Sequence, residues 1–247
     1  MKISVAGLTV ELNNRYDHIV RLAHDYLAPD SEPDFSVFAT DEELEAERRA
    51  SSNFSFDNGY LESIVLYRKI AEQLPRYNAY VFHGAVLGID GEAYAFTAKS
   101  GVGKTTHVRL WHEVFGKKVH VLNGDKPIIR FIDGVPYAAG TPWRGKENYG
   151  IPEMLPLKGI GFLERAEHNC AEEMSISDAQ IKLVSQMYIP KDRMGALLAL
   201  GLADKTLRSV RLVSVRANME RGAAEEAYRA LAAKSVNNTD EDPTERI

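Results

Sequence analysis

Cysteine is almost missing from this chain, which holds a single one, Cys170, among its 247 residues. One thiol excludes an internal disulfide framework and any metal site built on several cysteines. A lone cysteine is more typical of a small buried side chain than of a nucleophile. The sequence also lacks an apolar run of the roughly eighteen residues needed to cross a bilayer, and it has no uninterrupted apolar segment at its start. These absences favour a reducing, cytoplasmic environment and no membrane partner.

An excess of positive charge is absent as well. Lysine and arginine number 30 against 35 acidic residues, which gives a net charge of −5. Proteins that bind nucleic acids need a basic face to neutralise phosphates, so this balance argues against a nucleic-acid partner. The hydrophobic content of 45% is typical of a globular protein, and the length suits one α/β domain with or without a small appended lobe.

The most informative segment spans residues 93–111. An apolar stretch with strand composition leads into a turn with two glycines, and apolar residues at helical spacing follow. Because Gly101 and Gly103 lack Cβ atoms, backbone N–H groups can converge there on a phosphate oxygen at the positive end of the helix. We therefore predict a nucleoside-triphosphate site whose phosphates are held by the loop residues Ser100, Gly101, Val102, Gly103, Lys104, Thr105 and Thr106. Lys104 would reach the β and γ phosphates, and the Thr105 hydroxyl would ligate Mg²⁺.

This phosphate loop departs from the usual pattern at one position. The pattern is glycine, four residues, glycine, lysine, and serine or threonine, and Ala98 stands where the first glycine belongs. Alanine fits any position that needs no positive φ, so the prediction stands, but the loop is expected to differ from the standard conformation. The alternative is an ordinary turn between a strand and a helix, with an exposed lysine.

The pattern around the loop predicts a mixed α/β fold. A hairpin within residues 2–12, a helix at 16–27 and a strand at 35–39 precede a capping box at Thr40, which opens a charged helix. An apolar helical stripe covers residues 61–74. A strand at 80–88, the turn Asp90-Gly91 and a strand at 92–97 form a hairpin that enters the loop, which is unusual for doubly wound nucleotide-binding folds.

Further elements follow the loop. Strands are predicted at 118–122, 128–132, 135–139, 157–164, 171–174 and 210–215, and helices at 177–187, 192–202 and 223–232. We divide the chain into an N-terminal hairpin and helix segment packed on the core (1–56), a phosphate-loop domain (57–234) and a polar, acidic tail (235–247) that we expect to be disordered.

Two more segments carry candidate site residues. Asp125 follows a predicted strand about twenty residues beyond Lys104, where a magnesium-binding or catalytic carboxylate would lie in a phosphate-loop enzyme. The loop at 140–147 is rich in turn residues and contains Arg144 and Lys146, two cations suited to anion recognition. An ordinary exposed turn remains the alternative for that loop.

Together these segments resemble the catalytic domain of the HPr kinase/phosphorylase family and, more distantly, ATP-dependent phosphoenolpyruvate carboxykinase. The likeness is strongest to the smaller HPr-kinase-like proteins of bacteria and covers residues 1 to about 232. It rests on four motifs in this order: His83-Gly84, Ser100-Gly-Val-Gly-Lys-Thr105, Leu122-Asn-Gly-Asp-Lys-Pro127 and Gly140-Thr-Pro-Trp-Arg-Gly-Lys146. The resemblance implies a phosphate-loop fold of that family, a mixed β-sheet with hairpins and flanking helices, and ATP and Mg²⁺ as cofactors.

The resemblance also implies roles for individual residues. Lys104 would neutralise charge on the transferred phosphoryl group, and His83 would lie near that group. Asp125 would act as general base and would share the metal with Thr105. Arg144 or Lys146 would orient the acceptor or stabilise equatorial oxygens.

One feature of the family is missing. HPr kinases carry two adjacent aspartates, and Gly124 replaces the first of them here. Either Asp125 serves both roles, or a carboxylate such as Glu164 substitutes, or turnover is slow.

The predicted function is transfer of the γ-phosphoryl group of ATP to a hydroxyl of an unidentified peptide, protein or small molecule. HPr is a poor candidate acceptor, because no counterpart of the family's longer C-terminal signature is recognisable. A lyase like phosphoenolpyruvate carboxykinase is one alternative, although its second metal site and basic residues cannot be located. A nucleotide sensor or scaffold without catalysis is the other, favoured by Gly124 and Ala98. The sequence does not separate ATP from GTP or fix the oligomeric state.

Overall fold

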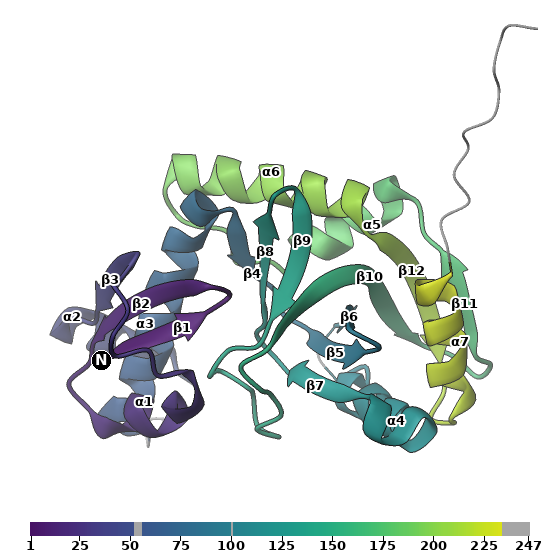
Figure 1. The fold of residues 1–247 in the computed structure, drawn as a ribbon, viewed down its shortest axis with the longest axis horizontal. Helices are drawn as coiled ribbons and strands as arrows, with labels where there is room; N and C mark the ends of the chain where they lie inside the picture. Colours follow the sequence, from purple (N-terminus) through teal and green to yellow (C-terminus); the bar gives the residue numbers. More distant parts are fainter. Residues whose placement is uncertain (52–55, 100, 234–247) are drawn as a thin grey trace, which may run out of the picture.

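The computed structural model describes residues 1–51, 56–99 and 101–233, arranged as a small N-terminal sheet beside a large mixed sheet with helices on both of its faces (Figure 1). Ser100 and the tail at 235–247, for which the sequence predicts a phosphate contact and disorder, lie outside the described residues. The mixed α/β class expected from the sequence is confirmed. Within the described ranges, every helix is too short or too polar to cross a membrane.

The N-terminal sheet contains β1 (Lys2–Val5), β2 (Leu8–Asn13) and β3 (Phe35–Phe38). The predicted hairpin joins β1 to β2, with Ala6 and Gly7 both at positive φ in its turn, and β3 runs parallel to β2. Between β2 and β3 the predicted helix is shorter than expected: α1 (Asp17–Leu22) is followed by a single 3₁₀ turn at His24–Tyr26.

Two helices connect this sheet to the rest of the chain. The predicted capping box starts α2 (Asp41–Ala50): the Thr40 side chain accepts from the backbone of Glu43, and the Glu43 side chain accepts from the backbone of Thr40. The apolar stripe of α3 (Asn58–Gln73) shares one core with the N-terminal sheet, where Leu66 and Ile70 are fully buried. Each such side chain stabilises the fold by about 1.5–3 kcal/mol, so the N-terminal segment is held by packing and not by its strands alone.

The large sheet has, among the described residues, the strand order β4-β8-β9-β10-β6-β5-β7, with β12 beside β10 and β11 beside β12. Its strands are β4 (Ala79–Val81), β5 (Ala85–Ile89), β6 (Glu92–Thr97), β7 (His120–Asn123), β8 (Ile128–Ile132), β9 (Val135–Ala139), β10 (Met154–Arg165), β11 (Cys170–Glu173) and β12 (Arg211–Ala217). Of these, β6, β10 and β12 are parallel neighbours. Their carboxyl ends therefore meet at one edge, where α/β proteins bind ligands.

The segment at 80–88, predicted as one strand, is two strands in the structure. β4 pairs with β8, whereas β5 pairs with β6 and β7, and the chain changes partner at His83 and Gly84. A Cβ on Gly84 would lie 2.7 Å from the carbonyl oxygen of Phe96, so the backbone crosses β6 closer than any other residue allows. The expected hairpin from β5 to β6 is present, with Asp90 and Gly91 both at positive φ.

Helices cover both faces of this sheet. On one face α4 (Lys104–Phe115) and α7 (Gly222–Ala232) bury Trp111 and Leu231 in a core with Tyr94 and Phe96. On the other, α5 (Ile176–Val184) and α6 (Arg193–Ser209) pack Leu183 and other apolar residues on the strands. α6 extends well past the predicted 192–202 and lies along one edge of the molecule above β8 and β9 (Figure 1).

Candidate functional site

The phosphate loop joins the end of β6 to the start of α4, at the edge where the parallel strands end. Gly101 and Gly103 have φ of +79° and +123°, a region that side chains disfavour, so both glycines are required by the backbone. The loop closes with the Val102 N–H donating to the Lys99 carbonyl at 3.2 Å, and α4 begins with the His107 N–H donating to Gly103 at 2.9 Å. Ala98 is buried, which suits its small side chain.

Lys104 is the first residue of α4 and is partly buried. In the described part of the chain its ammonium makes one side-chain hydrogen bond, a long one of 3.4 Å to the Ala98 carbonyl. Burial lowers the pKa of Lys104, and the negative charge of Asp125 opposes that shift. Because an ammonium group has three donors, Lys104 retains capacity for acceptors such as phosphate oxygens.

Asp125 lies between two cationic or potentially cationic side chains. Its Oδ1 is 3.4 Å from the Nε2 of His83, and its Oδ2 accepts from the Nζ of Lys126 at 2.9 Å. Burial alone would raise the pKa of Asp125, but the hydrogen bond with His83 and the charge of Lys126 outweigh it, so the pKa is well below its usual range. The carboxylate therefore stays ionised at physiological pH.

Asn123, which the sequence analysis did not single out, fixes the position of Asp125. Its side chain is fully buried, and its Oδ1 accepts from the backbone N–H of Asp125 at 2.8 Å and of Lys126 at 2.7 Å. Its amide nitrogen donates to the carbonyl and hydroxyl of Thr141. An asparagine two residues before an aspartate at a strand end is typical of such a turn, so the signal was present in the sequence.

His83 is held in place from both sides. Its backbone N–H donates to the Gln186 carbonyl at 2.7 Å, and its carbonyl accepts from the Thr97 hydroxyl at 2.9 Å. The next N–H along the chain, that of Gly84, donates to the backbone carbonyl of Asp125 at 3.0 Å. The change of strand partner at residues 83 and 84 thus brings His83 to Asp125.

The segment at 143–147 folds over Asp125. Gly145 has a φ of +75°, and a Cβ at this position would lie 2.8 Å from the Cβ of Asp125. This turn carries Glu147 to the phosphate loop, where its Oε1 accepts from the Thr105 hydroxyl at 3.3 Å. Sequence reasoning missed Glu147, because nothing local marks an exposed glutamate 42 residues beyond the threonine it contacts.

Hard oxygen ligands for Mg²⁺ are available here, although the described residues contain no cluster of three or more His, Cys, Asp or Glu side chains that could hold a metal alone. Magnesium sites in phosphoryl-transfer proteins commonly use one or two carboxylates, with phosphate oxygens and water completing the shell. Thr105 and Glu147, which contact each other, and Asp125, on which Gly145 of the same turn packs, carry oxygen donors of that kind.

The two predicted cations of this segment lie differently. The Arg144 guanidinium is mostly buried, donates to the Oδ2 of Asp25 at 2.9 Å and lies 5.5 Å from the centre of the Tyr26 ring. It is therefore directed to the N-terminal segment and not to the phosphate loop. Lys146 is exposed beside Gly145. Trp143 stacks on Tyr67 at 4.1 Å and anchors the segment in the core that α3 shares with the N-terminal sheet.

Arg165, the last residue of β10, is a further contact of the phosphate loop that sequence reasoning missed. Its guanidinium donates to the carbonyl of Val102 at 3.1 Å and to that of Gly101. Its neighbour Glu164, the substitute carboxylate considered from the sequence, is instead held by Lys182 of α5. A strand-terminal arginine has no local signature, because its partners lie 63 and 64 residues away.

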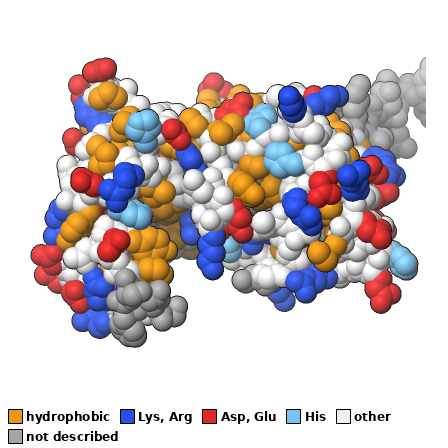
Figure 2. Space-filling view, turned by 90° about the horizontal axis from the view of Figure 1, so that it is seen from below, with side chains coloured by type: hydrophobic (Ala, Val, Ile, Leu, Met, Phe, Trp, Pro, Cys, Tyr) orange, Lys and Arg blue, Asp and Glu red, His pale blue; other side chains and the backbone are white. Residues whose placement is uncertain are grey.

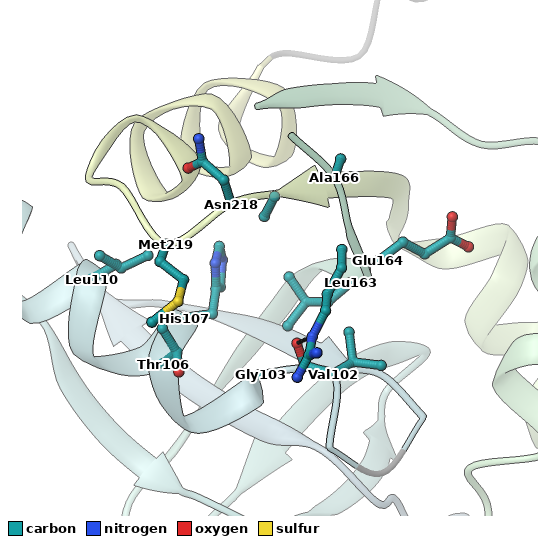
Figure 3. A pocket seen from close by; sticks show the side chains of 12 residues that line it. Val102, Gly103, Thr106, His107, Leu110, Leu163, Glu164, Ala166, Asn218 and Met219 are labelled. Carbon is teal, nitrogen blue, oxygen red and sulfur yellow. Dashed lines mark hydrogen bonds between the residues drawn. The ribbon is translucent and has the colours of Figure 1, made fainter. Parts of the chain in front are cut away.

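Two cavities border the loop. One, of about 480 Å³, lies between the loop and α5, and Thr97, Lys99, Lys182 and Gln186 contribute to its wall. The other, of about 390 Å³, lies between α4 and the ends of β10 and β12 (Figure 3).

Seen from the side of α4 and β7, basic, acidic and apolar side chains are intermixed on the surface (Figure 2). The cavities and the loop are thus the features of this edge that suit a ligand.

Comparisons with known proteins assign this chain to no family. No protein-family model matches it, and no curated protein sequence matches it. Among solved structures, the HPr(Ser) kinase/phosphatase from Coxiella burnetii is similar at 11% identity and a TM-score of 0.29, over 51% of this chain and 95% of that chain. A likeness at this level assigns neither an activity nor a site to this chain. The structure itself is a mixed α/β fold with a glycine-containing loop at the ends of its parallel strands.

Proposed function

We propose that the protein is a kinase that transfers the γ-phosphoryl group of ATP to a hydroxyl group of an acceptor not yet identified. One observation carries the proposal: a glycine turn that opens α4 lies at the carboxyl end of a parallel strand, with Lys104 as the first residue of the helix. The negative charge of Asp125 favours the charged form of Lys104. Backbone N–H groups at the start of a helix favour phosphate oxygens, and Lys104 has donors to spare for them.

The remaining residues fit the needs of phosphoryl transfer. Positioning and charge neutralisation supply most of the rate in such reactions. Thr105, with Asp125 or Glu147, would hold Mg²⁺, which neutralises charge on the phosphates when bound. The exposed Lys146 would approach the acceptor, whereas Arg144, committed to Asp25, would act by holding its segment in place.

Asp125 would accept a hydrogen bond from the acceptor hydroxyl. Its lowered pKa makes it a weak base, but in a loose transition state it serves mainly to orient the nucleophile. His83 and Lys126 would keep the carboxylate fixed and charged while the hydroxyl attacks.

The test combines nucleotide binding with transfer. Titration calorimetry with Mg-ATP should give binding at least about tenfold weaker for Lys104→Ala than for the wild type, since a charge-assisted hydrogen bond is lost. Lys117→Ala, which changes an exposed lysine beyond the other end of α4, is the matched control and should bind normally. Asp125→Asn should keep nucleotide binding and lose about 10²–10³-fold in transfer of radiolabel from ATP to an acceptor in cell extract. Equal binding by wild type and Lys104→Ala would sink the site assignment.

A nucleotide sensor that binds ATP without transferring it is the second candidate. It is favoured by Gly124, which leaves Asp125 as the one carboxylate of the strand end, and by the low basicity of Asp125. A sensor would bind Mg-ATP and label nothing in extract, which separates it from a kinase in the same experiment.

A further inference from the structure

The cavity on the α4 side of the phosphate loop is continuous with that loop. Gly103 and Thr106 form part of its wall, so a molecule held by the loop borders the cavity directly. The apolar part of the remaining wall comes from the loop, from α4 and from the ends of two parallel strands: Val102, Leu110, Leu163, Ala166, Ala217 and Met219. Glu164, Arg165 and Asn218 add polar groups at the strand ends. An apolar slot beside a phosphate site suits a flat, weakly hydrated group at the far end of a phosphorylated ligand.

His107 supplies a buried polar group on the α4 side of this wall. Its ring is 3% exposed and stands between Met219 and Leu163 (Figure 3). The Nε2 of His107 is 3.0 Å from the indole nitrogen of Trp111, and because an indole N–H only donates, this Nε2 is the acceptor. The proton of the neutral imidazole is therefore on Nδ1.

The Nδ1–H of His107 has no hydrogen-bond partner among the residues that the structure describes. Burial lowers the pKa of His107 to about 3, so the ring stays neutral and keeps this tautomer at physiological pH. Buried donors in folded proteins almost always find an acceptor, so one without a protein partner is satisfied by a water molecule or by a ligand. Phe96 packs against the ring with centroids 4.6 Å apart and helps to hold its orientation.

We propose that this cavity binds the base of a purine nucleoside triphosphate and that the Nδ1–H of His107, which the side chains around it enclose in this structure, donates to an acceptor on the edge of that base once they move aside. The inference rests on the proposed function, because the phosphate loop must hold the triphosphate. A purine base has two apolar faces and a ring nitrogen, N7, that accepts in adenine and guanine alike and that pyrimidines lack. Met219, which is 72% exposed and flexible, forms an outer wall that adapts to the base.

The geometry of the chain supports this direction for the ligand. The cavity lies outside the carboxyl ends of β10, the parallel neighbour of the strand that enters the loop, and of β12, the parallel neighbour of β10. Asp125, His83 and Lys126 do not line it. The base would therefore lie toward the ends of β10 and β12, and the reacting phosphate would lie toward Asp125 and His83.

The experiment compares Mg-ATP, Mg-GTP, Mg-UTP and magnesium tripolyphosphate by titration calorimetry. Tripolyphosphate tests the loop alone, because it carries no base. With the wild type, ATP and GTP should bind at least tenfold more tightly than tripolyphosphate, and UTP should bind more weakly than either purine nucleotide.

Two variants and one control locate the effect. His107→Phe keeps the ring and removes its donor, so ATP should bind about tenfold more weakly while tripolyphosphate binding is unchanged. His112→Phe makes the same change at an exposed position of α4 outside the cavity and should alter neither. Because His107→Phe also leaves the Trp111 N–H without its acceptor, Ala166→Phe provides an independent test: it fills the cavity and should reduce ATP affinity to that of tripolyphosphate.

The outcomes separate the two proposals. If ATP and tripolyphosphate bind the wild type equally, the base pocket is overturned and the phosphate site stands. If neither binds, the proposed function fails and the base pocket fails with it. UTP binding as tight as that of ATP, or full purine selectivity in Ala166→Phe, would also overturn the assignment.

Discussion

Two charged side chains, one in the N-terminal half and one in the phosphate loop, have contrasting surroundings. Glu62 of α3 is fully buried, and its carboxylate accepts from the backbone N–H groups of Arg15 at 2.8 Å and Tyr16 at 3.1 Å. Lys104 is also withdrawn from water, yet the described residues offer it one long hydrogen bond. The backbone supplies hydrogen-bond partners for Glu62, which stabilises the fold. Lys104 keeps unused donors at the edge where the parallel strands end, which points to a ligand there.

The largest effect is expected at Glu62. Replacement by Ala removes the charged acceptor of two part-buried backbone N–H groups, so the free energy of unfolding should fall by about 3 kcal/mol in urea titrations. Affinity for Mg-ATP should not change, because the contacts of the Glu62 carboxylate are with Arg15 and Tyr16. Glu45→Ala removes an exposed carboxylate of α2 and should alter stability by less than about 0.5 kcal/mol. A loss of ATP affinity in Glu62→Ala would show that the N-terminal half and the phosphate loop do not act independently.

Lys104→Met should have opposite effects on binding and stability. Loss of the ammonium removes charge-assisted hydrogen bonds to phosphate of about 1.5–3 kcal/mol, so Mg-ATP should bind about ten- to a hundredfold more weakly. The melting temperature should rise, because a partly buried cation whose pKa is lowered by burial has been replaced by an apolar side chain. Lys117→Met is the control for the change in charge. A lower melting temperature in Lys104→Met would mean that the lysine serves the fold as Glu62 does.

Asp125 provides a prediction on pH. Since its pKa is lowered in the folded state, its contribution to stability is complete above the unfolded value of about 4 and is lost as pH falls through the folded value. At pH 7 the wild type should exceed Asp125→Asn by about 1.5 kcal/mol in the free energy of unfolding. The difference should shrink steadily below pH 4. A gap that stays constant between pH 7 and pH 3 would contradict the contacts with His83 and Lys126.

The smallest effect separates backbone strain from site geometry. Gly145→Ala and Gly134→Ala each place a side chain at positive φ and should each cost about 1 kcal/mol of stability. A Cβ at 145 would press on Asp125, whereas a Cβ at 134 would meet nothing within 4 Å. Only Gly145→Ala should therefore reduce phosphoryl transfer, by several-fold. Equal transfer by both variants would show that the position of Asp125 tolerates this displacement.

Local signals account for what the sequence predicts well. The capping box at Thr40, the Asp90-Gly91 turn, the hairpin of β8 and β9 and the glycine turn before α4 all depend on residues a few positions apart. Apolar periodicity likewise finds α3 and most of the strands, with errors at their ends.

Contacts between residues far apart in the chain could not be predicted from the sequence. The partner exchange at Gly84 depends on the approach of Phe96, and the direction of Arg144 depends on Asp25, 119 residues earlier. The tautomer of His107 follows from Trp111, four residues along the helix. That its Nδ1–H has no acceptor in the described ranges follows from how α4 packs against the strands. No pattern along the chain encodes such three-dimensional neighbours.

The packing of Trp143 predicts how truncation of the N-terminal segment would affect this protein. Its ring stacks on Tyr67 and its indole N–H donates to the Ser63 carbonyl, within a core whose other half comes from residues before 40. A shortened chain beginning at residue 57 would keep every phosphate-loop residue, yet it would strip the packing from beneath the turn that covers Asp125. The N-terminal sheet therefore supports the turn that covers Asp125, and we expect its removal to destabilise that turn.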